Sequence, residues 1–240
     1  MHKFKDIDYI LAKIEYNTIN RWYMKSILLL LTILTFDLSA TDFAGYINHK
    51  NCDKIIDKQV FTICYDYRMK GAKYVAYTLS GSKVNAVNIK KRSSFYTEKN
   101  LKKQYRSQTK DYTHTGYDRG HLANDASFDY NKNVLRKTYT MANIIPQAPV
   151  VNRKTWIKAE KLERKVAVSL GTVNIINGVI YSSSPKRIGE NRVAVPDAFW
   201  KMIYNDSKNY KKCFYYKNDL KAEVKGDKLK DHLVDCSTMD

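Results

Sequence analysis

Residues 152–170 read NRKTWIKAEKLERKVAVSL and form the most prominent helical pattern in the chain. The apolar side chains recur at the spacing of an α-helix, at Trp156, Ala159, Leu162, Val166 and Leu170. This spacing gives the helix one apolar stripe, and Gly171 follows where a helix commonly ends. The pattern therefore predicts one amphipathic helix that packs against the rest of a domain.

Strand-like segments lie on both sides of this helix in the sequence. They are rich in β-branched and aromatic residues and predict strands at residues 73–79, 84–89, 138–145, 173–181 and 192–204, the last around 199–203. Residues 90–115 are polar and irregular, which predicts a long functional loop. Several strands with one helix, rather than alternating strands and helices, favour an α+β fold with a mainly antiparallel sheet.

The charge of the chain is strongly positive. Lys and Arg number 42 against 24 Asp and Glu, a formal net charge of +18, and the excess is spread along the sequence. Such a charge predicts a polyanionic partner, of which nucleic acid is the first candidate. The alternative is a basic soluble protein without such a partner, or one that binds anionic membranes.

The amino terminus has the pattern of a secretory leader. Met24 opens a basic and polar start, residues 27–36 are almost wholly apolar, and residues 38–40 supply the small side chains of a cleavage site. The apolar run is short for a permanent membrane anchor. We predict a leader and extension at residues 1–40, with translation starting at Met24, and a single domain at residues 41–240. The expected location is periplasmic or secreted.

Four cysteines follow the predicted leader, and their even number suits an oxidising compartment. Three pairings are open. Because the two early and the two late cysteines are each close in sequence, we predict disulfides Cys52–Cys64 and Cys213–Cys236. The spacing does not match a zinc site.

Three short motifs carry the chemistry: Asp118-Arg119-Gly120-His121, Asn143-Ile144-Ile145-Pro146-Gln147 and Asn152-Arg153-Lys154-Thr155-Trp156. Together they make the chain resemble the DNA/RNA non-specific endonuclease family of the ββα-metal, or His-Me finger, superfamily, over about residues 73–200. The resemblance implies a ββα-metal catalytic finger, Mg²⁺ as cofactor with Mn²⁺ as a substitute, and cleavage of DNA and RNA to 5′-phosphate products. It also makes a homodimer an expectation.

Phosphodiester hydrolysis needs a base for the attacking water, a cation at the leaving oxygen and positive charge at the other phosphate oxygens. His121 suits the first role, because an imidazole titrates near neutral pH and can accept a proton. The alternative is a histidine that only packs in the core or lies on the surface. The other four histidines of the chain lie in no comparable motif.

Asn152 suits the second role, since an amide oxygen is a hard neutral ligand for Mg²⁺. A helix N-cap is the alternative, and both roles are compatible. The resemblance implies that Asn152 is the only direct protein ligand and that Glu160 holds a metal-bound water. In a regular α-helix the four-residue spacing of Asn152, Trp156, Glu160 and Arg164 places them on one ridge. The alternative for Glu160 and Arg164 is an ordinary exposed ion pair.

Three arginines are candidates for the third role. Arg119 precedes the histidine by two residues, whereas Arg92 and Arg164 match phosphate-binding arginines of the family, and a guanidinium suits a phosphoryl group. Asn143 matches an active-site asparagine that orients the histidine or its loop. Its alternative is a polar turn residue.

Three positions depart from the commonest family pattern without removing a catalytic group. Asn124 stands where proline is common, Ala142 replaces serine, and Ala159 replaces leucine. These changes affect the expected loop shapes. Two rival functions keep the same fold: a non-catalytic protein for nucleic-acid binding or uptake, and a toxin-like nuclease effector.

Overall fold

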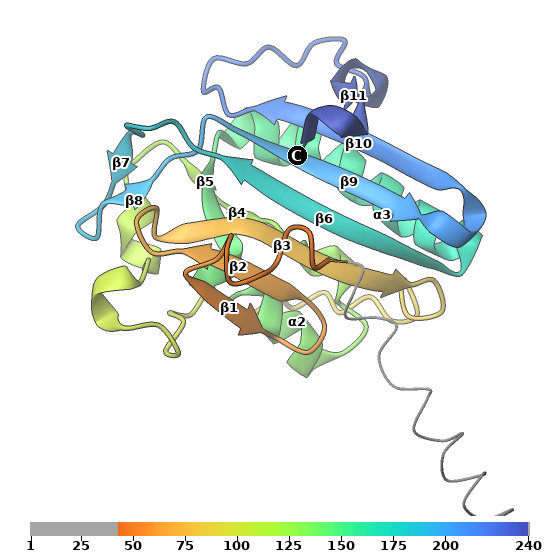
Figure 1. Ribbon diagram of the computed structural model, residues 1–240, viewed down its shortest axis with the longest axis horizontal. Coiled ribbons are helices and arrows are strands. Elements are labelled where there is room, and N and C mark those ends of the chain that lie inside the picture. Colours follow the sequence, from red (N-terminus) through yellow and green to blue (C-terminus); the bar gives the residue numbers. More distant parts are fainter. Residues whose placement is uncertain (1–42, 240) are drawn as a thin grey trace, which may run out of the picture. The chain divides into compact units, whose positions relative to one another are not determined.

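The computed structural model describes residues 43–239, and its elements are labelled in Figure 1. Seven strands form one antiparallel sheet in the order β1-β2-β3-β6-β9-β10-β11. Their bounds are β1 (Lys54–Asp57), β2 (Thr62–Asp66), β3 (Gly71–Ser80), β6 (Thr172–Ile180), β9 (Ala198–Asn205), β10 (Tyr210–Lys217) and β11 (Leu233–Val234).

The remaining elements lie outside this sheet. Strands β4 (Asp118–His121) and β5 (Ile144–Gln147) form an antiparallel pair, and so do the short strands β7 (Arg187–Ile188) and β8 (Val193–Ala194). The α-helices are α2 (Lys132–Thr138) and α3 (Ile157–Leu170). The expected α+β class with a mainly antiparallel sheet is confirmed.

Helix α3 covers one face of the sheet, behind β6 and β9 in the view of Figure 1. Every residue of β9 is buried, because this strand lies near the middle of the sheet. Trp156 anchors the start of the helix to that face: its fully buried ring meets Phe199 of β9 and Tyr216 of β10 edge-on, at centroid distances of 4.9 and 5.2 Å. The predicted packing role of Trp156 is thus confirmed.

The expectation of a regular α-helix from Asn152 is wrong. Val151–Trp156 form a π-helical turn, and α3 begins only at Ile157. The hydroxyl of Thr155 donates to the carbonyl oxygen of Val151 over 3.2 Å, and that carbonyl is the acceptor that a regular helix offers to the amide of Thr155. The ridge argument based on α-helical spacing therefore does not hold for Asn152. The predicted end at Gly171, with φ of 86°, is confirmed.

Two predicted strands need correction. Residues 84–89 form no strand, because Val84 closes a turn by donating from its amide to the carbonyl of Ser80 and then packs into the core. Residues 138–145 are not one strand either, since α2 ends at Thr138 and β5 starts only at Ile144. Alternating apolar residues arise in such turns as well as in strands. The predictions at 73–79, 173–181 and 199–203 correspond to β3, β6 and β9.

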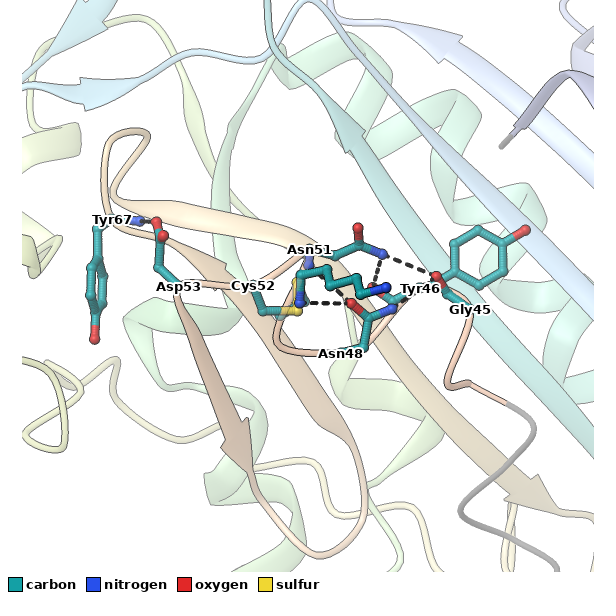
Figure 2. Close-up of a disulfide and its surroundings, with 9 residues drawn as sticks. Gly45, Tyr46, Asn48, Asn51, Cys52, Asp53 and Tyr67 are labelled. Carbon is teal, nitrogen blue, oxygen red and sulfur yellow. Dashed lines mark hydrogen bonds between the residues drawn. A yellow bond between two sulfur atoms is a disulfide. The ribbon is translucent and has the colours of Figure 1, made fainter.

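Both predicted disulfides are present. Cys52–Cys64 ties the segment before β1 to β2, and Cys213–Cys236 ties β10 to the carboxyl-terminal segment. Figure 2 shows the surroundings of the first, where the carboxylate of Asp53 accepts from the amide of Tyr67. The two bonds close loops at the two ends of the described chain.

The long segment 90–115 is mostly irregular, as predicted, with two short 3₁₀ turns at Lys103–Tyr105 and Thr109–Tyr112 and a β-bridge from Tyr96 to Thr140. The leader predicted at residues 1–40 lies outside the described residues. Within residues 43–239, no helix has both the length and the apolar character needed to cross a bilayer.

Candidate active site

His121 lies at the end of β4, where the pairing with β5 fixes its backbone. A side chain at the preceding Gly120 would collide with Gln147, since a Cβ there would lie 2.0 Å from its Oε1. Only glycine therefore allows the two strands to approach. The imidazole packs against the rings of Phe95 and Tyr139, with centroids 5.5 and 4.9 Å away.

The Nε2 atom of His121 is buried and makes no hydrogen bond with any described residue. A buried polar atom without a partner is costly, which marks it as a functional candidate. The pKa of His121 is lowered to about 4, mainly by burial; Arg92 also lowers it, and Asp125 opposes the fall. The imidazole is thus neutral at physiological pH, the form in which it can accept a proton.

Asn143 secures the loop that follows His121. Its fully buried side chain accepts a hydrogen bond from the amide of Ala123 (2.9 Å) and donates to the carbonyls of Ala123 (2.9 Å) and Thr138 (2.8 Å). Its own carbonyl accepts from the amide of Leu122 over 3.1 Å. Asn143 was expected to orient either the histidine or its loop, and these contacts support orientation of the loop.

Arg92 reaches the same site from the long irregular segment. Its guanidinium forms ion pairs with Asp125 (3.5 Å) and Asp129 (3.2 Å), and it stays about one-third exposed, at 38%. Asp125 also accepts a hydrogen bond of 2.5 Å from the hydroxyl of Tyr139, whose ring contacts His121. Sequence reasoning missed Asp125, because one carboxylate in a polar loop forms no pattern.

Glu160 of α3 is half-buried, and its carboxylate makes no hydrogen bond or ion pair in the described part of the chain. The pKa of Glu160 is raised to about 7, mainly by burial; Glu163 and Asp125 also raise it, and Lys201 and Arg164 oppose the rise. Asp125 acts electrostatically on both His121 and Glu160. The structure therefore brings these residues to one site.

The ion pair between Glu160 and Arg164, the alternative to their catalytic roles, is not formed within residues 43–239. Arg164 donates instead from Nη1 to Oδ1 of Asn124, over 2.9 Å. Asn124 lies three residues after His121, so this bond joins α3 to the histidine loop. Sequence reasoning noted Asn124 only as a departure from the family pattern.

Asn152 lies in the π-helical turn, beside the other end of β4. Its Nδ2 donates to Asp118 over 2.9 Å, and Arg153 binds the same carboxylate with two hydrogen bonds of 2.7 and 2.5 Å. Burial raises the pKa of Asp118, but the hydrogen bonds from Arg153 and Asn152 outweigh it, and the pKa is lowered. The N-cap alternative is wrong, because the cap of this turn is Val150 and no backbone amide within residues 43–239 donates to the Asn152 side chain.

Arg119 is on the same side of β4 as His121, since strand residues two apart share a face. Its guanidinium donates to the carbonyl of Thr109 over 2.7 and 3.3 Å and lies over the rings of Phe95 and Tyr112. Phe95 therefore contacts both Arg119 and His121. The role of Arg119 at phosphate stays a prediction.

The candidates for a metal are oxygen atoms without protein partners. Asp118 fixes the side chain of Asn152 by accepting from its Nδ2, and Oδ1 of Asn152 accepts no hydrogen bond from any residue within 43–239. Glu160 likewise keeps its oxygens unpaired. Amide and carboxylate oxygens suit a hard cation that retains most of its water. Groups of three or more His, Cys, Asp or Glu arranged for a metal ion are absent from residues 43–239.

Taken together, two short strands carry a histidine and a following helix carries unpaired oxygen atoms, which is the arrangement of a ββα finger. Residues 40–237 match the family described as DNA/RNA non-specific endonuclease. The chain therefore belongs to the DNA/RNA non-specific endonuclease family.

Individual relatives agree with this assignment. Human mitochondrial endonuclease G is 27% identical over 156 residues, covering 61% of this chain and 52% of that protein. Mitochondrial nuclease 1 of Schizosaccharomyces pombe is 26% identical over 182 residues, covering 70% and 56%. The chain thus spans about half the length of these curated relatives.

A crystal structure of the EndoG/EndoGI complex, described as showing the mechanism of EndoG inhibition, has a similar fold. Its TM-score is 0.69 at 23% identity, and the match covers 77% of this chain and 81% of that one. The likeness concerns the fold alone.

Proposed function

We propose that the protein is a periplasmic or secreted endonuclease that hydrolyses phosphodiester bonds of DNA and RNA with little sequence preference and depends on Mg²⁺. The observation that carries the proposal is the buried Nε2 of His121, which has no hydrogen-bond partner among residues 43–239, on an imidazole whose lowered pKa keeps it neutral at physiological pH. Membership of the family supports the reaction class.

The residues divide the work as follows. His121 accepts a proton from the attacking water, and the neutral imidazole is ready to do so at physiological pH. Arg92 and Arg164 offer guanidinium groups to the non-bridging phosphate oxygens. Asn143 holds the loop that carries His121, and Arg119 is the further candidate at phosphate.

The metal is expected at Asn152 through Oδ1, with Glu160 holding a coordinated water. When bound, Mg²⁺ supplies positive charge for the leaving 3′ oxygen, and Mn²⁺ is the expected substitute. The unpaired oxygens of both residues support this assignment. Because contacts to phosphate carry no base information directly, weak sequence preference and inhibition by salt are expected.

The test compares plasmid DNA and RNA incubated with the purified protein in Mg²⁺ or EDTA. We expect cleavage of both polymers that stops with EDTA. The variant His121→Ala should lower kcat by about 100-fold or more, as loss of a general base does. His49→Ala, at an exposed histidine distant in sequence from the motif, serves as the matched control and should cleave normally.

Intact polymers under several divalent ions, with binding retained in a gel-shift measurement, would instead favour the non-catalytic binding protein. A toxin-like effector has the same chemistry and would be recognised by growth arrest on expression without its leader. Size-exclusion chromatography tests the expected homodimer.

The two disulfides support an oxidising compartment. We expect a reducing agent to lower the melting temperature, since removal of one such bond costs about 2–5 kcal/mol in small exported domains. Thermal denaturation with and without reductant measures this. An unchanged melting curve would remove the support that the cysteines give to export.

A further inference from the structure

Asn124 connects the histidine loop with the helix that carries Arg164. Its side chain is 2% exposed and makes four hydrogen bonds in the described structure. Nδ2 donates to Oε1 of Glu163 over 2.5 Å, and Oδ1 accepts from Nη1 of Arg164 over 2.9 Å. Oδ1 also accepts from the amide (3.0 Å) and hydroxyl (3.1 Å) of Ser127.

These contacts fix the orientation of the amide. A carboxylate accepts and a guanidinium donates, so exchange of the amide oxygen and nitrogen would lose both bonds. The side chain of Asn124 can therefore hold Arg164 only in the arrangement observed. A side chain in a flexible contact could turn its amide either way, whereas that of Asn124 cannot.

The anchor on the other side is rigid. Glu163 is fully buried and accepts from Nζ of Lys201 over 2.5 Å and from the hydroxyl of Tyr77 over 2.9 Å. Lys201 is itself fully buried and also donates to Asn177 over 2.7 Å. Asn124 is thus attached to a satisfied network in the sheet rather than to a mobile surface group.

Arg164 depends on this attachment. The bond to Asn124 is the sole hydrogen bond of its guanidinium within residues 43–239, so the other N–H groups remain for a ligand. We propose that Asn124 is a positioning residue that holds the guanidinium of Arg164 at a fixed place relative to His121 for phosphodiester hydrolysis. This inference rests on the proposed nuclease function.

A purely local role is the rival explanation, because Asn124 also caps the 3₁₀ turn Asp125–Ser127. Asn131 offers a matched control: its Oδ1 accepts from the amides of Asn133 and Val134 at the start of α2, in an exposed position. A capping role without positioning would make Asn124→Ala and Asn131→Ala alike in kinetics.

The decisive experiment is a double-mutant cycle in the full chain, with Asn124→Ala, Arg164→Ala and the double variant. Loss of a hydrogen bond to a charged group predicts a fall in kcat of about tenfold for Asn124→Ala, with KM within about twofold. In the Arg164→Ala background the same change should cost less than about twofold. Asn131→Ala should leave kcat unchanged.

Equal losses in both backgrounds, or an unchanged kcat for Asn124→Ala, would overturn the proposal. Asn124→Pro provides a second variant if alanine impairs folding, because the φ of −72° at this position is one that proline adopts. This substitution removes the side-chain amide of Asn124 while it keeps the backbone conformation, and we expect the same tenfold fall in kcat.

A readout without turnover separates this proposal from the proposed function. Nitrogen-15 NMR of arginine side chains measures how freely the Arg164 guanidinium rotates. We expect restricted rotation in the unsubstituted chain and rapid rotation in Asn124→Ala and Asn124→Pro. Rotation that is equally free in all three would overturn the positioning role, even if the protein cleaved no nucleic acid.

Discussion

Two glutamates of α3, three residues apart, have opposite surroundings. Glu163 is fully buried, and its carboxylate accepts hydrogen bonds from four side chains, those of Tyr77, Asn124, Ser127 and Lys201. Glu160 is half-buried and accepts none in the described chain. The same residue type on the same helix is thus saturated at one position and unpaired at the other.

The difference in hydrogen bonding distinguishes a structural carboxylate, Glu163, from a candidate functional one, Glu160. A saturated carboxylate has no lone pair left for a ligand, so Glu163 can only fix geometry. An unpaired carboxylate keeps its capacity for a metal-bound water, at the cost that burial raises its pKa. His121 follows the second pattern, because its Nε2 is buried and has no partner in the part of the chain that the structure describes.

The largest expected effect is on stability at the saturated position. Glu163→Gln leaves the ammonium of Lys201 buried without a negative partner, and breaking a buried pair in this way costs about 3–5 kcal/mol. Urea unfolding of the full chain measures this loss. A loss below about 1 kcal/mol would mean that the pair is not the anchor described here.

The next effect is on activity at the unpaired position. Glu160→Gln should lower kcat about 100-fold, in the range found when one electrostatic group is removed from an active site. The free energy of unfolding should not fall, because no hydrogen bond is lost. Glu190→Gln, at an exposed ion pair with Lys110, is the matched control and should leave kcat unchanged. If Glu160→Gln lost stability but kept normal activity, Glu160 would be a structural residue like Glu163 and not a functional one.

The third effect concerns the pH dependence set by His121. Since its folded pKa is about 4 and the ordinary value is 6.5, the unfolded chain binds a proton that the folded chain does not between these pH values. Stability should therefore fall as pH drops from 6.5 to 4, by about 1–3 kcal/mol from this residue. Comparing unfolding of His121→Asn with the unsubstituted protein at pH 7 and pH 5 isolates this contribution.

The same shift predicts the activity profile. If neutral His121 is the base, its protonation should give kcat/KM no acid limb above pH 6, so an acid limb near pH 7 should come from Glu160, whose pKa is raised to about 7. The residual activity of Glu160→Gln should therefore be level between pH 6 and 7.5, and an acid limb at pH 6.5 or above in that variant would mean that the imidazole is protonated more readily than its burial implies.

Periodic patterns predicted much of the fold. The apolar stripe of α3 and the β-branched segments of β3, β6 and β9 face a large buried surface, so their patterns are strong. Residues 84–89 misled the prediction because a turn buries Val84 and exposes Val87. Alternation alone cannot distinguish such a turn from a strand.

The site was only partly readable in the sequence. His121 and Asn152 lie in motifs, so their importance follows from the residues around them. Asp118, Asn124 and Asp125 act through contacts between segments far apart in the chain, and no local pattern records these contacts. The unpaired state of Glu160 likewise depends on what its neighbours bind.

The π-helical turn at Val151–Trp156 changes the phase of the helix. One residue of an α-helix advances about 100° around the axis, so a turn with different winding aims Asn152 independently of Glu160. Deleting one residue within this turn would rotate the amide away from Asp118 while leaving the apolar stripe of α3 on the sheet. The π-helical turn thus allows the apolar side chains of α3 to pack on the sheet while the side chain of Asn152 is directed toward Asp118.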